Sequence, residues 1–396
     1  MQRAAYRRRM AAVVAIVLLL PGALYAAGVR SSQFENHALA PFPTPDAGWD
    51  YFRNLSTWTT DNIPLRQQGV QVTNWIDENL FNDPPGSNGG GGTGVPGIPS
   101  VTYPGLVYPS VIYGRDGYLF YGEDIRLKCE PPRTVEQIIG AIDALARAVQ
   151  QSGREFVLMV APDKSTVLPD LMPAFYPGRE CAAQRSRQMR DALDGLEYAP
   201  DLFSVLSDVA VDDPAVYLPL DTHWGGAGGE AFIRTLVTTL APGIESSFEP
   251  RELRPSRQKG DLTVLAGRPE LMTVRHYALH SPRIRENWQS IEPISESAVL
   301  HTASGPPGTQ VEGTTLLIGD SFLDAAGADL PYFFESSIKV HHGAASSDPA
   351  TLVSNMIAAD AVVIEMVERQ FASGDAPLFN ASFIDAALAA LASNPR

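Results

Sequence analysis

The chain lacks several features that would assign it to a common functional class. No Lys/Arg run exists beyond the N-terminus, and 45 acidic against 30 basic residues give a net charge of -15, so nucleic-acid binding is not expected. No HExxH motif or closely spaced cysteine pair supports a zinc site, and no internal repeat is visible. Hydrophobic residues make up 44% of the chain, enough for a substantial core. We therefore expect a globular protein that needs no cofactor or metal.

The first 29 residues read as a targeting segment. Four arginines and no acidic residue occur among the first nine positions, and the stretch "AAVVAIVLLLPGALYAAGV" that follows is almost entirely apolar. Two interpretations remain open, a cleaved signal peptide and an uncleaved N-terminal membrane anchor. Both predict that the rest of the chain is extracytoplasmic, in the periplasm or at the cell surface, with membrane contact through this segment.

Only two cysteines are present, Cys129 and Cys181. An exported chain with an even cysteine count favours one disulfide between them. The alternative is two separate buried thiols.

Three parts are expected along the chain. Residues 1–29 form the targeting segment, residues 30–133 a segment that packs on the catalytic domain, and residues 134–396 the catalytic domain itself. Within the second part, residues 83–100 are rich in Gly, Pro and Ser and predict a flexible loop. No Gly-Lys-Ser/Thr follows, so this loop is not a phosphate-binding loop. Shortly after it, Asp116-Gly117 predicts a hairpin turn.

From Thr134 onward, strands are expected to alternate with helices. Thr134 and Gln137 form a possible capping box at the start of the first of these helices. The expected strands are 155–162, 215–220, 315–318, 336–342 and 361–367, and the expected helices are 134–153, 184–196, 201–208, 228–240, 322–326, 349–359 and one from 381. This alternation is typical of a doubly wound α/β fold with a mostly parallel sheet. In such sheets, functional sites form at the carboxyl ends of the strands.

Ser321 follows one of these strands. The apolar run 315–318 ends in a turn at Gly319-Asp320, and a helix can begin at the next residues. A serine at a strand-to-helix turn suits a nucleophile, because it is exposed beside the amides of a helix N-terminus. It also suits an ordinary helix N-cap.

Asp221 and His223 follow another expected strand in "VYLPLDTHWGG". A serine nucleophile needs a base, and that base is usually oriented by a carboxylate, so Asp221, His223 and Ser321 are the candidate triad. Trp224 could line one side of the site. The alternatives are helix capping by Asp221 or His223 and a core role for Trp224.

Other polar residues at strand ends give further candidates. Either His341 or His342 could replace His223 as the base, or could bind a metal together with Asp221 and His223. Lys164 and its neighbour Asp163 could line the site, Lys164 as a substrate-binding residue, although both are expected to be exposed loop residues. A structural ion pair is the expected role of Glu365, Glu368 and Arg369.

Several motifs together carry a family resemblance. They are "FENHALAPFP", "DNIPLR", "GRDGYLFYGED", "VAPDKSTVLPDLMP", "DTHW", "IGDSF" and "VVIEMVER". In this order they resemble the alginate O-acetyltransferase AlgJ/AlgX family, whose catalytic domain is SGNH-hydrolase-like. Ordinary SGNH hydrolases place the serine motif first, whereas here the Asp-x-His motif precedes it, as in this permuted family. The resemblance implies a flavodoxin-like, mostly parallel sheet with helices on both faces.

The resemblance also implies a function. It assigns Ser321 as nucleophile, His223 as base and Asp221 as the residue that orients the base. The expected reaction is transfer of an acetyl group, through an acetyl-serine, to hydroxyls of an exported polysaccharide. The expected partners are the polysaccharide acceptor and a membrane-bound O-acyltransferase that supplies acetyl groups. The alternatives are an extracytoplasmic carbohydrate acetyl esterase with the same triad and a non-catalytic polysaccharide assembly protein.

Overall fold

The fold is described here from a computed structural model of the whole chain. It describes residues 108–249, 251–279, 285–286 and 293–396, and among the first 64 residues only 23–25, 27–29, 42–44, 51, 55, 58–59, 62 and 64. The chain divides into two compact units, residues 1–88 with 263–269 and residues 89–262 with 270–396. The loop predicted at 83–100 and most of the targeting segment lie outside the described residues. Those predictions, and the expected boundary at residue 133, stay predictions.

The second unit carries the regular secondary structure. Its strands are β1 (Val111–Tyr113), β2 (Leu119–Tyr121), β3 (Glu155–Ala161), β4 (Arg251–Glu252), β5 (Ser256–Lys259), β6 (Leu271–Val274), β7 (Tyr277–Ala278), β8 (Arg285–Glu286), β9 (Val299–Ser304), β10 (Val311–Gly319), β11 (Phe334–His341) and β12 (Ala361–Val367). Its α-helices are α4 (Glu123–Cys129), α5 (Val135–Gln151), α6 (Lys164–Val167), α7 (Arg179–Leu193), α8 (Leu202–Asp212), α9 (Gly226–Leu240), α11 (Ser321–Ala325), α12 (Ala344–Ser347), α13 (Pro349–Ala358), α14 (Glu368–Ser373) and α15 (Ala381–Ser393). Of the short α10 (Asp261–Leu265), only the first two residues belong to this unit.

One six-stranded sheet organises this unit, in the order β3-β12-β10-β11-β9-β8. The first four strands pair in parallel, and β9 and β8 add an antiparallel edge. The expected mostly parallel sheet is confirmed. Because parallel strands end at the same edge, the segments after β3, β10, β11 and β12 meet there.

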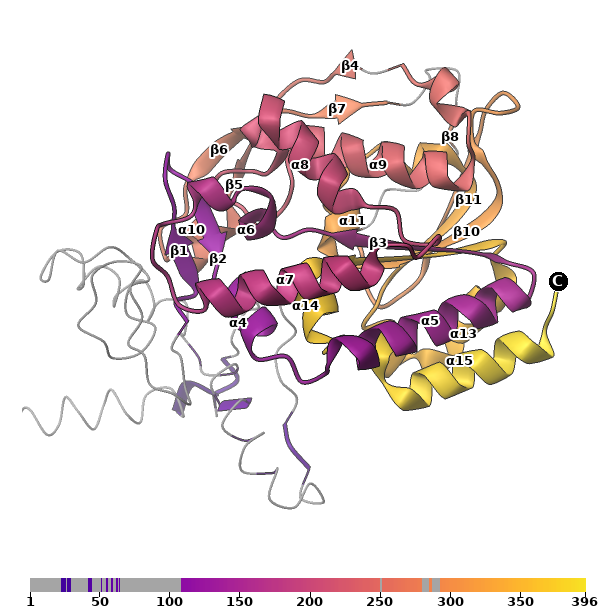
Figure 1. Cartoon of the computed structure of the whole chain (residues 1–396), viewed down its shortest axis with the longest axis horizontal. Coiled ribbons are helices and arrows are strands. Elements are labelled where there is room, and N and C mark those ends of the chain that lie inside the picture. Colours follow the sequence, from indigo (N-terminus) through magenta and orange to yellow (C-terminus); the bar gives the residue numbers. More distant parts are fainter. Residues whose placement is uncertain are drawn as a thin grey trace, which may run out of the picture. The chain divides into compact units, whose positions relative to one another are not determined.

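Helices cover both faces of the sheet, as expected. Alternate residues of β3 point to opposite faces: Val157 and Met159 belong to one buried apolar cluster, and Phe156 and Leu158 belong to the other. Helix α9 packs on the first face, while α5, α13 and α15 pack on the second, on opposite sides of the sheet in Figure 1. Burial of both strand faces explains why the central strands are continuous apolar runs.

Local signals predicted several elements correctly. Thr134 and Gln137 form the reciprocal capping box that begins α5. Asp116 and Gly117 adopt positive φ angles of 54° and 78° in the turn between β1 and β2, which pair antiparallel. Each of these features depends on neighbours a few residues away, which sequence patterns report well.

The strand expected at 215–220 is wrong. The segment instead contains a short 3-10 helix, Pro214–Val216, and an irregular loop with one isolated bridge between Tyr217 and Trp224. Pro219 has no N–H to donate to a sheet, and its carbonyl accepts from the backbone of Leu119 instead. The loop therefore contacts β2 of the two-stranded β1-β2 sheet and is not a strand of the six-stranded sheet.

The predicted disulfide is confirmed. Cys129 of α4 and Cys181 of α7 are bonded, with their Cα atoms 5.3 Å apart.

Among the described residues, no single helix has the length and apolar character to cross a membrane, although the bent pair Glu368–Phe379 and Ala381–Ser393 meets those two criteria together.

Candidate active site

Ser321 lies at the turn between β10 and α11, where the sequence placed it. The N-cap of α11 is Asp320, whose carboxylate accepts from the amide of Phe322 at 2.9 Å and from the amide of Val367, also at 2.9 Å. Asp320 therefore caps the helix, and the interpretation of Ser321 as an N-cap is wrong. Ser321 is exposed, and its hydroxyl is not the group that caps the helix.

A buried carboxyl group supports this turn from behind. Glu365 of β12 is fully buried, and its Oε2 accepts from the backbone amide of Asp320 at 3.0 Å. A Cβ on Gly319 would come within 2.6 Å of that oxygen, so the approach depends on glycine. Burial, and then the charge of Asp320, raise the pKa of Glu365 well above its ordinary value.

His223 connects Ser321 to Asp221. Its Nε2 lies 2.8 Å from Oγ of Ser321, and its Nδ1 lies 2.7 Å from Oδ1 of Asp221. The same carboxylate oxygen accepts from the backbone amide of His223 at 3.1 Å. An Nδ1 proton donated to Asp221 leaves Nε2 to accept the hydroxyl proton of Ser321, which is the arrangement that a serine nucleophile needs.

The two ionisable partners shift each other's pKa. Burial by itself raises the pKa of Asp221, but the hydrogen bond and charge of His223 outweigh it, and the pKa is held below its ordinary value. Burial alone lowers the pKa of His223, but the hydrogen bond and charge of Asp221, with Asp261 nearby, raise it above its usual value. The imidazolium form is thus stabilised, as a base that accepts a proton during reaction requires.

Lys164 holds the loop that carries Asp221 and His223. Its Nζ donates to the backbone carbonyls of Asp221 at 2.6 Å, Leu218 at 2.9 Å and Pro219 at 3.3 Å. The side chain is 1% exposed, and burial lowers the pKa of Lys164 to about 8. The expectation that Lys164 is an exposed, substrate-binding residue is therefore wrong, because its ammonium group is occupied by the backbone of the loop.

Asp163 is also buried, and the expectation that it lines the site is wrong. Its carboxylate forms ion pairs with Lys128 at 2.8 Å and with Arg369 at 3.0 Å. Arg369 pairs with Asp124 at 3.2 Å, and Lys128 pairs with Glu368 at 3.2 Å. Glu368 and Arg369 thus take part in buried structural ion pairs, as predicted. The same expectation is wrong for Glu365, whose carboxyl group accepts from the backbone amide of Asp320 instead.

Trp224 is 1% exposed and lies at the floor of the site. Its ring packs at 4.9 Å from the rings of Phe232 and Phe322. This position makes it part of the core beneath the base, and a direct contact with substrate stays a prediction.

His341 and His342 do not reach Ser321 as His223 does. Their rings stack on each other at 4.2 Å, and the Nδ1 of His341 accepts from the amide of Gly343 at 3.0 Å. Burial and the neighbouring His341 lower the pKa of His342 to about 4, which keeps it neutral near pH 7. Among the described residues, the group whose ligand atoms could surround a metal is Asp221, His223 and Asp261, without either of these histidines.

The triad opens into a cleft of about 690 Å³. Its far wall comes from the short strands β4 to β7, which sequence patterns did not identify, because strands of two to four residues carry little periodicity. The polar side chains of Arg251, Gln258, His276 and Tyr277 line this wall. The cleft therefore places several hydrogen-bonding side chains around one exposed nucleophile.

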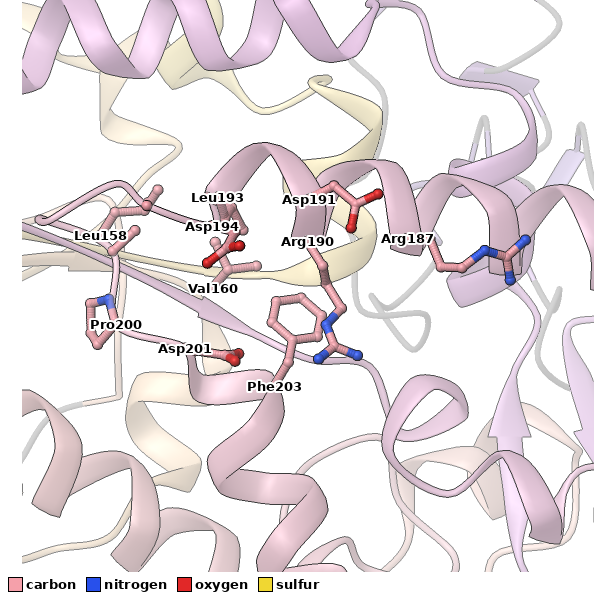
Figure 2. A pocket seen from close by; sticks show the side chains of 12 residues that line it. Leu158, Val160, Arg187, Arg190, Asp191, Leu193, Asp194, Pro200, Asp201 and Phe203 are labelled. Atoms are coloured by element: carbon pink, nitrogen blue, oxygen red, sulfur yellow. The ribbon is translucent and has the colours of Figure 1, made fainter.

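A second pocket lies away from the triad. Figure 2 shows it between α7 and the segment before α8, against the middle of β3, with Arg190, Asp201 and Phe203 among its lining side chains. The guanidinium of Arg190 lies 5.3 Å from the ring centre of Phe203. It contains none of the triad residues, and the middle of a strand is not where open α/β sheets bind substrates. The triad cleft is thus the better candidate active site.

Comparisons with known proteins show the family of this chain. Residues 111–337 match the family described as ALGX, SGNH hydrolase-like domain, acetyltransferase AlgX. The "Probable alginate O-acetylase AlgJ" of Pseudomonas syringae pv. tomato is 23% identical over 208 residues, covering 51% of this chain and 47% of that protein. The protein with the same description from Pseudomonas aeruginosa is 30% identical over 164 residues, covering 39% and 40%.

A solved structure, the O-acetyltransferase domain of Pseudomonas putida AlgJ, aligns with 71% of this chain and 99% of its own, at 19% identity and a TM-score of 0.43. The alignments span less than half the length of the curated relatives. The family match, in contrast, covers more than half of this chain and includes Asp221, His223 and Ser321. The chain therefore belongs to the AlgX family of SGNH hydrolase-like acetyltransferase domains.

Proposed function

We propose that this protein is an O-acetyltransferase that acetylates hydroxyl groups of an exported polysaccharide. The observation that carries the proposal is the continuous hydrogen-bonded chain from Asp221 through His223 to Ser321, at 2.7 and 2.8 Å. The family match and the alginate O-acetylases among the relatives support the choice of acetyl transfer.

In the first step, Oγ of Ser321 attacks the carbonyl carbon of an acetyl ester. Nε2 of His223 takes the hydroxyl proton as the Ser321–carbon bond forms, and Asp221 stabilises the resulting imidazolium. The backbone amide of Ser321, at the first turn of α11, is placed to donate to the oxyanion. The tetrahedral intermediate then expels the donor alcohol, which receives its proton from His223, and acetyl-Ser321 remains.

In the second step, a sugar hydroxyl in the cleft attacks the acetyl carbonyl. His223 accepts the proton of that hydroxyl and returns it to Oγ of Ser321 as the acyl bond breaks. Water in place of the sugar would give free acetate from the same groups, which is the esterase alternative.

The setting of the reaction is part of the proposal. The basic and apolar residues 1–29 support export or membrane anchoring, and hence an extracytoplasmic site of action. An acetyl donor outside the cytoplasm would be supplied by a membrane-bound O-acyltransferase as partner.

The test uses the full chain purified in detergent, with 4-nitrophenyl acetate as donor and a neutral oligosaccharide as acceptor. We expect a single acetyl group on Ser321 by intact mass and peptide mapping, and its transfer to the sugar. The Ser321→Ala variant should carry none, while Ser354→Ala, which alters an exposed serine of α13, should behave like the unaltered protein.

Two results would contradict the proposal. Free acetate formed at one rate with or without sugar would identify an esterase. Absence of both the acetyl adduct and turnover in the unaltered protein, as in Ser321→Ala, would rule out Ser321 as the nucleophile and favour a non-catalytic assembly role.

A further inference from the structure

Asp261 contacts both residues that make up the catalytic base, although no sequence motif indicated it. Its backbone amide donates to Oδ2 of Asp221 at 3.0 Å. Its carboxylate accepts from the amide of Thr222 at 2.8 Å and from Oγ1 of Thr222 at 2.5 Å. Oδ2 of Asp261, which accepts from Oγ1 of Thr222, lies 3.8 Å from Nδ1 of His223. Two carboxylates therefore face one ring nitrogen.

The fold brings Asp261 to this position through a close backbone approach. Strand β5 pairs with β6 and delivers the chain to Gly260, whose amide donates to the carbonyl of Glu270 at 3.2 Å. A Cβ at Gly260 would lie 2.0 Å from the carbonyl oxygen of Leu220, so only glycine permits this contact with the loop. The backbone contacts of Gly260 with Glu270 and with Leu220 thus hold Asp261 against the loop 218–223.

We propose that Asp261 is a positioning residue of the base: its amide orients Asp221, and its carboxylate provides a second negative charge that stabilises the His223 imidazolium in each transfer step. This inference rests on the proposed function, because it assigns the proton acceptor of that reaction. Asp221 accepts the hydrogen bond from Nδ1 of His223 directly at 2.7 Å, whereas Asp261 acts through charge and through the loop.

The charged groups around His223 favour this role. Asp221 and Asp261 both raise the pKa of His223, while burial and the cation Arg369 of α14 lower it. The buried cation Lys164 faces both carboxylates from α6. The ring of Phe322, from α11, contributes an apolar face at 4.9 Å. Because both anions favour the imidazolium, removal of either one should lower the pKa of His223.

The test is a titration of the His223 ring by NMR in the full chain, in a Ser321→Ala background in which no turnover occurs. Asp261→Asn keeps the backbone amide that binds Asp221 and removes only the charge. We expect the pKa of His223 to fall by about one unit. Asp261→Glu should recover most of that shift, and Asp191→Asn, which removes an exposed charge on α7, should leave it unchanged.

Activity gives the second readout, measured in the chain that retains Ser321. In Asp261→Asn, kcat/KM for acetyl transfer should fall about tenfold near pH 7, with its lower pH limb moved to lower pH. A purely structural role would lower kcat/KM without moving that limb. If Asp261→Asn fails to fold, Asp261→Ser gives the same neutralisation with a smaller side chain.

The outcomes separate this inference from the proposed function. An unchanged pKa of His223 in a folded Asp261→Asn or Asp261→Ser protein would overturn the role of Asp261, even if Ser321 is acetylated. Activity that survives in Ser321→Ala would overturn the proposed function, while the titration shift could still occur. A pKa of His223 in the unaltered protein that changes on addition of Zn²⁺ or EDTA would indicate a metal site at Asp221, His223 and Asp261, and would also overturn the charge role.

Discussion

Two segments carry the candidate triad, and they are built in opposite ways. Ser321 stands between a nine-residue strand, β10, and a capped helix, α11. Asp221 and His223 stand in an irregular loop that belongs to no strand of the main sheet. The nucleophile is held mainly by regular backbone structure, whereas the base is held by side chains and backbone from distant parts of the chain.

The difference lies in how many contacts each segment can lose. β10 pairs on both sides, with β11 and β12, so the turn at Ser321 has support beyond any single side chain. The loop at 218–221 relies on the ammonium group of Lys164, which donates to three of its carbonyls. We therefore expect single substitutions around the base to disturb activity more than those around the nucleophile's turn, apart from replacement of the nucleophile itself.

The largest effect is expected from Ser321→Ala. Loss of the nucleophile should lower kcat by at least about 10³-fold, as for other serine nucleophiles. Because the side chain is exposed, the free energy of unfolding should change by no more than about 0.5 kcal/mol. Steady-state kinetics and urea unfolding measure the two quantities. A substantial residual kcat with retained fold would assign the chemistry to another group.

The second-largest effect is expected from Lys164→Met, which removes the ammonium group that holds the loop at 218–221. Loss of the ammonium group leaves three carbonyls without their donor, and we expect a decrease in the free energy of unfolding of about 3 kcal/mol. Displacement of Asp221 and His223 should lower kcat/KM by about 10²-fold.

The matched control is Lys259→Met, which removes an exposed lysine of β5. It should change the free energy of unfolding by less than about 0.5 kcal/mol. Equal effects of the two substitutions in urea unfolding would contradict the role of Lys164 in holding the loop.

The pH dependence should show opposite trends for activity and stability. The pKa of His223 is raised above its ordinary 6.5, so kcat/KM should fall about tenfold for each pH unit below that raised value. The stability from its pair with Asp221 is fully present below about pH 6.5 and is lost as pH rises through the raised pKa. Asp221, whose pKa is lowered, contributes stability that is lost as pH falls through its lowered value.

This trend is measured by kcat/KM and by urea unfolding across pH 5 to 9. His223→Gln should remove the decline in stability across the neutral range. A decline that persists in His223→Gln would assign it to another group.

The smallest effect is expected from Asp320→Ala, which removes the cap of α11. The amides of Phe322 and Val367 lose their acceptor, and the free energy of unfolding should decrease by about 1–2 kcal/mol. Because β10 and its neighbours still hold the turn, kcat/KM should fall by less than about tenfold. A decrease in kcat/KM as large as that of Lys164→Met would show that the turn at Ser321 depends on single side chains as strongly as the loop does.

Much of the fold and three residues of the site were accessible from sequence patterns. The buried strands, the capping box at Thr134 and the turn at Asp116-Gly117 depend on neighbours within a few residues, so their patterns are readable. The pairing of the Asp-x-His and serine motifs was also correct in outcome, since the structure brings their side chains within hydrogen-bonding distance. The strand expected directly before Asp221 is nevertheless absent, so Asp221 and His223 do not follow a strand end as predicted.

Residue order alone thus accounts for the alternating strands and helices, the cap signals and the identity of the triad candidates, because these follow from local periodicity and side-chain chemistry. Tertiary structure decided the burial of Lys164, the approach of Asp261 past Gly260 and the cleft wall of β4 to β7. The physical reason is separation along the chain. Residues 164, 221, 261 and 321 meet only after folding, and a lysine that looks exposed in the sequence becomes buried once three carbonyls of another segment can accept its protons.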